Sequence, residues 1–362
     1  MLRLYWVVGE LSAEQYAALL AQRLKALLPS LKQRGLAGPL MQAAGVSPYQ
    51  SWEAYSVVGF WEVARKLPRF IRLFRGIWQD IQKWKPDRVI LVDYPGLNLR
   101  LARQLQKAGI PFTYFISPQL WAWNPGRVKA LQTPLAEVLC ILPFETDFYA
   151  QYGVKAIYVG HPLVRMMKAV KPYEHPRPYI AILPGSRLSE IRQTLPVYVA
   201  AAQEFSEYDF IIAGVPHISG AIYERYRGPY PVVYGQTQSL LKGAQAALVT
   251  SGTATLEAAL ALCPSIIGYK GSYLSYWIAK QLVRVRFIGL PNLILNEPVF
   301  PELIQGDLKP ERVRAALSDL LRKRAEIIDR LRGLQDRLGS QDAIEVAAEH
   351  LAYALTATGR PA

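Results

Sequence analysis

An arginine stands where a helix is expected to begin in YIAILPGSRLSEIRQTL, residues 179–195. The apolar run Tyr179–Leu183 is typical of a buried strand, a proline and a glycine break it, and a helical pattern resumes near Ser189. A cation at a helix N-terminus is unfavourable by about 0.3–1 kcal/mol, because the exposed N–H groups there are electropositive. Either Arg187 points away or an anion lies between it and the helix, as a phosphate on the Gly185–Arg187 turn would.

A second turn of this kind lies in LVTSGTATLEAALAL, residues 248–262, where a predicted strand is followed by Ser251-Gly252-Thr253 and a helix. Small residues let a ligand reach bare backbone N–H groups, which suits a phosphate, although ordinary N-capping gives the same pattern. Glu257, one turn further on, could accept both hydroxyls of a ribose or simply complement the helix dipole. The two turns together favour phosphate binding in the second half of the chain.

Two carboxylates follow predicted strands in the first half, Glu10 in VVGELSAEQ and Asp93 in LVDYPGLNLRLA. Parallel strands end at one edge of a sheet, so both side chains are expected at that edge. Either could take a proton from an incoming hydroxyl as a general base, and either could merely cap the next helix. His161, in VGHPL, fits a structural or hinge-lining position better than a catalytic one.

Aromatic residues follow another predicted strand in ISPQLWAWNPGRVKAL, residues 116–131. Trp121 and Trp123 could stack on a sugar, cover an acyl chain or belong to the core.

Several familiar signatures are missing from the sequence. No G-x-x-x-x-G-K-[ST] or G-x-G-x-x-G occurs, so neither a P-loop NTPase nor an ordinary dinucleotide enzyme fits. C-x-x-C, H-E-x-x-H and Asp-x-Asp are missing too. We therefore expect protein charges to neutralise a bound diphosphate, with no metal and no other cofactor.

The elements that must position these residues alternate between apolar runs and amphipathic stretches, which predicts an α/β fold with parallel sheets. Ten predicted strands form two groups of five, as in two Rossmann-like sheets. They are Leu4–Val8, Arg88–Val92, Phe112–Ile116, Glu137–Ile141, Ala156–Val159, Tyr179–Leu183, Asp209–Ala213, Val232–Tyr234, Ala246–Thr250 and Ser265–Gly268. The segment SLKQRGLAGP leaves little room for a further strand after the first helix.

The domain boundary is expected in the proline-rich segment MMKAVKPYEHPRP, residues 166–178. We predict one domain over residues 1–165 and a second over 166–334. Two or three helices are expected between Lys309 and Leu355, with a break near Gly339. The last of them, from about residue 335 to 362, are expected to pack back on the first domain.

Basic residues are in excess, with 42 Lys and Arg against 28 Asp and Glu and a net charge of +14, which favours anionic partners. In GFWEVARKLPRFIRLFRGIW, residues 59–78, five cations and one acid interleave with apolar side chains at helical spacing. Such a helix lies in a membrane interface or packs on the core with a solvated basic face, and we favour an anionic membrane surface. The residues expected to face acyl chains or lipid are Phe60, Trp61, Arg69, Phe70, Arg72 and Phe74.

Other partners and compartments fit less well. No nucleic-acid-binding motif occurs, so nucleic acid is not an expected partner. The N-terminus MLRLYWVVGE is too short for a signal peptide, and no run of 18 apolar residues occurs. Cys140 and Cys263 lie in apolar contexts typical of core residues in a reducing compartment, so we expect a cytoplasmic protein.

Taken together, the motifs resemble those of lipid-A-disaccharide synthase, a family-19 glycosyltransferase of Gram-negative bacteria. The matching residues run nearly from end to end of the chain. They are Gly9-Glu10 with Ser12, AGPLMQAAG (37–45), SVVGFWEV (56–63), DYPGLN (93–98), SPQLWAW (117–123), LPFE (142–145), GHPL (160–163), LPGSR with Glu190 (183–190), SGTATLE (251–257), YK (269–270) and LPN (290–292).

The resemblance implies the GT-B fold, with two Rossmann-like domains facing each other across a cleft. It implies an inverting transfer from UDP-2,3-diacylglucosamine to 2,3-diacylglucosamine 1-phosphate (lipid X), at the inner face of the inner membrane. Asp93 would be the base or would orient the acceptor, with Glu10 and Ser12 beside it. The residues implied in UDP binding are Gly185, Ser186, Arg187, Ser251, Gly252, Thr253, Thr255, Glu257 and Asn292. A homodimer is left open.

One departure concerns the first loop, where the family usually reads Gly-Glu-x-Ser-Gly-Asp and this chain has Ala13-Glu14 after Ser12. Ala13 lacks the backbone freedom of glycine, which affects the expected geometry around Glu10. The alternatives are another UDP-sugar enzyme of this fold, such as a 2-epimerase or a transferase acting on a peptidoglycan lipid, and a non-catalytic peripheral protein that binds lipid or nucleotide.

Overall fold

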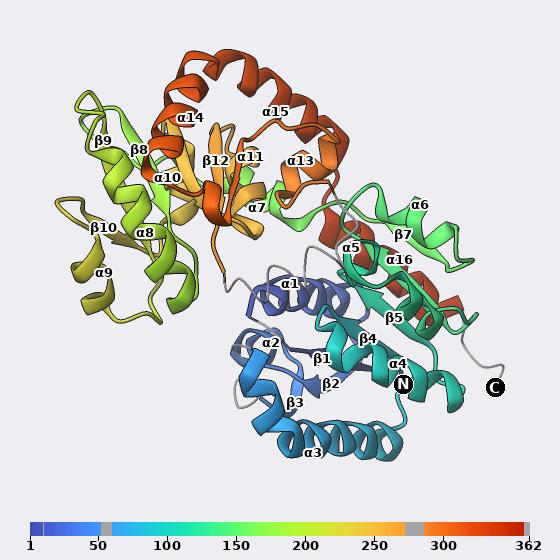
Figure 1. Cartoon of the computed structure of the whole chain (residues 1–362). Coiled ribbons are helices and arrows are strands. Elements are labelled where there is room, and N and C mark those ends of the chain that lie inside the picture. Colours follow the sequence, from blue (N-terminus) through green and yellow to red (C-terminus); the bar gives the residue numbers. More distant parts are fainter. Residues whose placement is uncertain (10, 52–59, 272–285, 358–362) are drawn as a thin grey trace. The chain divides into compact units, whose positions relative to one another are not determined.

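The computed structural model describes residues 1–9, 11–51, 60–271 and 286–357, and the side chains of residues 11, 12, 60–69 and 123 lie outside that description. The chain divides into two compact units. Unit 1 comprises residues 1–162 and 341–362, and unit 2 comprises residues 163–340. The polypeptide therefore enters unit 2 once and returns to unit 1 for its last helix (Figure 1).

Unit 1 is built on a seven-stranded parallel sheet with the order β3-β2-β1-β4-β5-β6-β7. The register pairs Val8 of β1 with Val92 of β4 and Val92 with Phe115 of β5, so these strands end at one edge. The strands are β1 (Arg3–Val8), β2 (Lys32–Leu36), β3 (Ser47–Gln50), β4 (Arg88–Val92), β5 (Phe112–Phe115), β6 (Ala136–Cys140) and β7 (Ala156–Tyr158).

The expectation of little room for a strand after the first helix is wrong, because β2 occupies Lys32–Leu36 and β3 follows it. Strand β2 begins with polar residues that find partners inside the fold. The Trp6 indole N–H donates to Gln33 Oε1 at 2.9 Å, and Gln33 Nε2 donates to the Ala21 carbonyl at 3.0 Å. Arg34 pairs with Asp80 at 2.9 Å. Such a strand has no apolar run, so hydrophobic periodicity misses it.

The helices of unit 1 cover both faces of this sheet. Tyr5 and Val7 face a core shared with α3 and α4, and the Trp6–Gln33 pair lies on the α1 side. Helix α16 packs against α1 although the two lie at opposite ends of the sequence, and Arg23 pairs with Glu345 between them (Figure 1). The helices are α1 (Leu11–Leu27), α2 (Pro39–Ala43), α3 (Phe60–Trp84), α4 (Pro95–Lys107), α5 (Leu120–Trp123), the 3₁₀ helix η2 (Pro125–Ala130), α6 (Glu145–Ala150) and α16 (Ala343–Ala357).

Unit 2 is built on a six-stranded parallel sheet with the order β10-β9-β8-β11-β12-β13. Its strands are β8 (Tyr179–Leu183), β9 (Asp209–Gly214), β10 (Val232–Tyr234), β11 (Ala246–Thr250), β12 (Ser265–Tyr269) and β13 (Glu302–Ile304). The predicted groups of five therefore become seven and six strands among the described residues. Strands β3 and β13 are short, and β2, β3 and β13 lie at or next to sheet edges.

The helices of unit 2 include the two that follow the phosphate-binding turns predicted above. They are α7 (Pro162–Ala169), α8 (Leu188–Ala202), α9 (Gly220–Tyr226), α10 (Thr237–Gly243), α11 (Thr253–Leu260), α13 (Leu290–Leu295), the 3₁₀ helix η3 (Gln305–Asp307), α14 (Pro310–Arg322) and α15 (Arg324–Leu338). Together with α16, the last two confirm three helices with a break at Gly339. The segment expected to connect the domains begins inside α7, and only its part after Ala169 is irregular. Among the described residues, no helix is both long and apolar enough to span a membrane.

Candidate functional site

Asp93 lies at the end of β4 in a strained turn. Asp93 has φ 45° and Tyr94 has φ 46°, a left-handed conformation that few residues other than glycine adopt. The surrounding core holds the turn in place, because Asn98 Nδ2 donates to the Asp93 carbonyl at 2.8 Å and the Tyr114 hydroxyl donates to the same oxygen. Ile116, at the end of the neighbouring β5, has φ 60°. Strain of this kind costs about 1–3 kcal/mol per residue and clusters at functional sites.

The start of α1 lies directly beside this turn. A Cβ added to Gly9 would come within 2.5 Å of the Tyr94 ring, so the ring packs on the bare glycine backbone. Glu10 and the side chain of Ser12 lie outside the described residues, and their predicted roles stay predictions. Glu14, part of the departure from the family pattern, is fully buried and accepts the Met41 N–H at 3.1 Å, which ties α1 to α2.

Glu145 is a buried carboxyl group at the same edge that the sequence analysis did not select. It follows β6, is 1% exposed, and accepts the Trp121 indole N–H at 3.1 Å and the Leu142 N–H at 3.1 Å. Burial raises the pKa of Glu145 to about 7, against the lowering effect of the hydrogen bond from the Trp121 indole. The sequence signals for it are a glutamate following a strand, which is a weak one, and its place at the end of the LPFE motif (142–145) in the family resemblance.

Trp121 is half-buried, and its ring lies edge-on to Phe144 with centroids 4.9 Å apart. Part of the indole therefore packs inside the unit, and its N–H is used by Glu145. The side chain of Trp123 lies outside the described residues.

His161 is buried at the end of the sheet, 4% exposed, with its ring edge-on to Tyr16. Burial lowers the pKa of His161 to about 3, so the ring is neutral at physiological pH. These surroundings favour the structural interpretation of this residue.

In unit 2, β8 and β11 are adjacent and parallel, with Val249 paired to Leu183, so α8 and α11 begin side by side at one edge. The anion at the start of α8 is the chain's own carboxylate. Glu190 Oε2 accepts the N–H groups of Ser186 and Arg187 at 3.0 and 3.2 Å, and Glu190 Oε1 pairs with the Arg187 guanidinium at 2.9 Å.

These contacts bear on one part of the predicted phosphate site, which stays a prediction. The N–H groups of Ser186 and Arg187 already have an acceptor, so a phosphate can use them only by displacing Glu190. The Arg187 side chain remains 63% exposed and open to a ligand. Gly185 has φ 105°, and a Cβ there would lie 2.5 Å from Glu190 Oε2, so the turn requires glycine. His217 Nε2 lies 2.9 Å from the Ser186 carbonyl and supports the turn.

The start of α11 is more open. Gly252 is the N-cap residue with φ 150°, and within the described residues no side-chain hydrogen bond caps the helix. Thr253 is exposed, Ser251 is half-buried with its N–H bonded to the Gly268 carbonyl, and the Thr255 hydroxyl donates to the Gly252 carbonyl. Thr255 is thus buried and supports the turn from inside.

Glu257 lies one turn into α11 and is largely enclosed, which raises the pKa of its carboxyl group. Gln238 Nε2 donates to Glu257 Oε1 at 2.9 Å and partly offsets this effect. The amide orients the carboxylate that the sequence analysis assigned to a ribose. Gln238 was not selected from the sequence, because its contact with Glu257 depends on how α10 packs beside α11.

Asn292, which the resemblance implies in UDP binding, lies inside unit 2, and its role in UDP binding stays a prediction. Its side chain is fully buried, with Nδ2 donating to the Phe300 carbonyl and to Glu302 Oε1, and Oδ1 accepting the Phe300 N–H. These hydrogen bonds connect α13 to the segment that leads into β13, so the side chain stabilises the fold of unit 2.

The described part of the basic aromatic segment has features of both predicted arrangements, a helix packed on the core and a helix at a membrane surface. Leu73, Ile77 and Ile81 of α3 are buried in the core, and Phe70 and Phe74 are half-buried against it. Arg72 is exposed. The side chains of Phe60, Trp61 and Arg69 lie outside the described residues. Across the part of the chain that the structure describes, no cluster of His, Cys, Asp or Glu could hold a metal ion.

Known proteins resemble this chain over nearly its whole length. A family model described as lipid-A-disaccharide synthetase matches residues 4–354. The lipid-A-disaccharide synthase of Myxococcus xanthus is 36% identical over 367 residues, covering 96% of each chain.

Solved structures agree with this at the level of the fold. The calicheamicin glycosyltransferase CalG4 superposes with a TM-score of 0.65 at 16% identity, covering all of both chains. A UDP-GlcNAc 2-epimerase from Neisseria meningitidis gives a TM-score of 0.63 at 10% identity, covering 97% of this chain and 98% of that one. The two parallel-sheet units are thus those of the GT-B fold, as predicted.

Proposed function

The chain belongs to the lipid-A-disaccharide synthase family and is a glycosyltransferase, and from this premise we propose that it joins UDP-2,3-diacylglucosamine to lipid X. The products are the β-1,6-linked disaccharide 1-phosphate and UDP. The observation that carries this proposal is the family match across residues 4–354, which spans both units.

In the proposed reaction, Asp93 accepts the proton of the acceptor's 6-hydroxyl while that oxygen bonds to C1 of the donor sugar. The bond from C1 to the UDP oxygen breaks on the opposite face, so a single displacement inverts the anomeric carbon. The half-buried carboxylate in its strained turn supports this role, because the turn fixes the position of a base. Glu10 is the alternative base.

The donor's diphosphate is proposed to lie at the uncapped start of α11 with the exposed Arg187 guanidinium as counter-charge. Glu257, held by Gln238, would accept the ribose hydroxyls. This arrangement needs no metal ion, and unchanged turnover in EDTA is the expected result.

The acylated substrates require the enzyme to work at a membrane surface, and we place it on the cytoplasmic face of the inner membrane. The exposed arginines and half-buried aromatics of α3 support peripheral binding to anionic lipid. Phe70→Asp with Phe74→Asp should reduce co-sedimentation with anionic liposomes, whereas Glu349→Gln on the exposed side of α16 should not. Undiminished co-sedimentation of the double variant would remove α3 from the membrane-binding surface.

The test of the activity is incubation of the purified protein with UDP-diacylglucosamine and lipid X, followed by mass spectrometry of the products. Asp93→Asn keeps the shape and tolerates the left-handed backbone, and we expect it to lower turnover by about 10²- to 10⁴-fold while UDP binding persists. Full activity of Asp93→Asn would shift the base to another carboxylate. Turnover of UDP-GlcNAc without disaccharide formation would instead identify an epimerase.

A further inference from the structure

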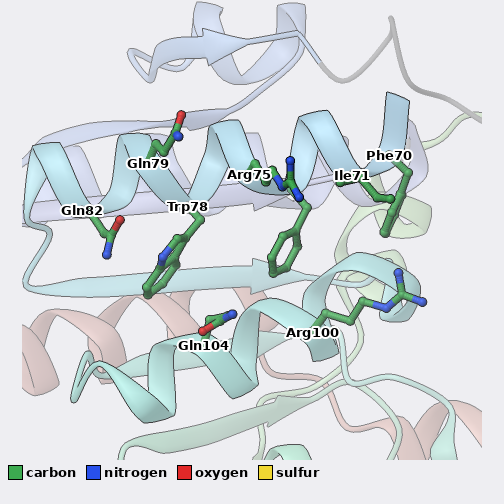
Figure 2. A pocket seen from close by; sticks show the side chains of 9 residues that line it. Phe70, Ile71, Arg75, Trp78, Gln79, Gln82, Arg100 and Gln104 are labelled. Carbon is green, nitrogen blue, oxygen red and sulfur yellow. The ribbon is translucent and has the colours of Figure 1, made fainter. Parts of the chain in front are cut away.

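A groove of about 430 Å³ runs between α3 and α4 on unit 1 (Figure 2). The half-buried rings of Phe70, Phe74 and Trp78 form its apolar side. The guanidinium groups of Arg75 and Arg100 lie at its rim, together with three glutamine amides. We refer to this surface as the α3–α4 groove.

Among the described residues, the charged side chains that line the groove are arginines only, with no Asp or Glu. The Arg100 guanidinium lies 5.1 Å from the centre of the Phe70 ring. Arg103 and Arg127 extend the cluster. Partial burial is the main cause that lowers the pKa of Arg127, and the positive charges of Arg103 and Arg100 lower it further. Across the described part of the chain, none of these four arginines forms an ion pair with a carboxylate. Guanidinium groups gathered without carboxylate partners repel one another, and an anion bound among them relieves that repulsion.

We propose that the α3–α4 groove binds one anionic phospholipid, with its phosphate between Arg75 and Arg100 and the start of an acyl chain on the Phe74 and Trp78 rings. The planar fork of a guanidinium matches a phosphate, and the aromatic side provides the apolar surface that an acyl chain needs. The inference rests on the membrane binding proposed above and deepens it, because it replaces diffuse attraction by a site with a defined stoichiometry.

The direction of the groove favours a membrane lipid over the acceptor substrate. Arg100 and Gln104 lie five and nine residues beyond Pro95, so the groove follows α4 for about 8 to 14 Å away from the edge where Asp93 lies. A chain seated on Trp78 therefore extends away from the proposed base. This geometry suits a lipid that anchors the enzyme and is not consumed.

The test titrates the full-length protein with dihexanoylphosphatidylglycerol below its micelle concentration and measures heat and stoichiometry. We expect saturable binding of one lipid per chain, and at least tenfold weaker binding of dihexanoylphosphatidylcholine, which has the same chains and no net charge. Arg75→Gln with Arg100→Gln should weaken the phosphatidylglycerol affinity at least tenfold. The control, Arg322→Gln with Arg332→Gln, removes two exposed charges from unit 2 and should bind like the wild type.

A second variant keeps the test decisive if the double arginine variant misfolds. Gln79→Glu changes almost no volume at an exposed position and adds a carboxylate to the rim, so it too should weaken binding. Unsaturable binding, equal affinity for the two lipids, or unchanged affinity in both groove variants would overturn the proposal.

A kinetic arm separates the phospholipid from the acceptor, whose phosphate shares its chemistry. In detergent without phospholipid, the arginine double variant should keep the wild-type KM for lipid X. A raised KM would assign the groove to the acceptor and overturn the phospholipid proposal, while leaving the glycosyltransferase activity standing. Loss of disaccharide formation in the wild type would refute the proposed function alone, because lipid titration does not depend on turnover.

Discussion

Replacing Glu145 by glutamine should change how the stability of unit 1 depends on pH. In the folded protein this carboxyl group is 1% exposed, and burial raises its pKa from 4.5 to about 7. The folded state therefore holds the proton more tightly than the unfolded state. Stability from this group is greatest below pH 4.5 and falls as the pH rises towards 7, because ionisation then opposes folding.

The magnitude follows from the two pKa values. At 1.36 kcal/mol for each pH unit between them, the wild type should lose about 3 kcal/mol of unfolding free energy between pH 4.5 and pH 7.5 through Glu145. Glutamine cannot ionise, and its NH2 group cannot accept a hydrogen bond as the hydroxyl oxygen of the protonated wild-type acid can, so one of the N–H groups of Trp121 and Leu142 loses its acceptor. The variant should therefore be less stable than the wild type near pH 5 by about 1–2 kcal/mol, and should equal or exceed it at pH 8.

Urea unfolding followed by tryptophan fluorescence measures this difference, since every tryptophan except Trp277 belongs to unit 1. The series runs from pH 5 to pH 8, with Glu349→Gln as an exposed control in the same unit. A constant difference between wild type and Glu145→Gln across this range would refute the argument. It would mean that the carboxyl group ionises as readily inside the protein as in water.

Three further predictions concern the turn before α8. Arg187→Ala should weaken UDP binding about 10- to 100-fold by calorimetry, as expected for losing a charged hydrogen-bond donor, whereas Arg192→Ala on the exposed side of α8 should not. Glu190→Gln should tighten UDP binding, because it removes an anion that occupies the same N–H groups; weaker binding would show that phosphate does not displace this side chain. Gly185→Ala should destabilise unit 2 by about 1–3 kcal/mol in thermal unfolding, since φ is 105° and the new Cβ meets Glu190. Gly220→Ala, at the start of α9, where the new Cβ would meet only the Tyr234 hydroxyl at an ordinary contact distance of 3.6 Å, is the matched control, and equal effects of the two would contradict this account.

Apolar runs predicted the buried strands β4, β8 and β11 with the bounds that the structure has, and the half-exposed edge strand β10 also has its predicted bounds. Buried parallel strands must be apolar on both faces, so each can be identified in the sequence as a continuous apolar run. Strand β2 was not predicted because it contains the polar residues Gln33 and Arg34. Their partners, a hydrogen bond with Trp6 and an ion pair with Asp80, are distant in sequence.

The candidate site was predictable where it depends on local sequence. A glutamate three residues after the N-cap residue of a helix is a known capping pattern, so Glu190 could have been identified as the acceptor at the start of α8. The left-handed backbone at Asp93 could not, because Asn98 and Tyr114 hold it through tertiary contacts. The burial of Asn292 and Glu145 likewise depends on packing that no local pattern encodes.

The return of α16 to unit 1 determines the order in which the two units can finish folding during synthesis. Residues 163–340 are continuous and can collapse as soon as they leave the ribosome, but the first 162 residues must wait for the last helix. Until then the side of α1 that packs against α16 stays uncovered, and Glu137 of β6 lacks its contact with His350. The earliest part of the chain to be synthesised is thus among the last to be completed, and a nascent chain lacking its final twenty residues would expose the face of α1 that α16 covers to chaperones and proteases.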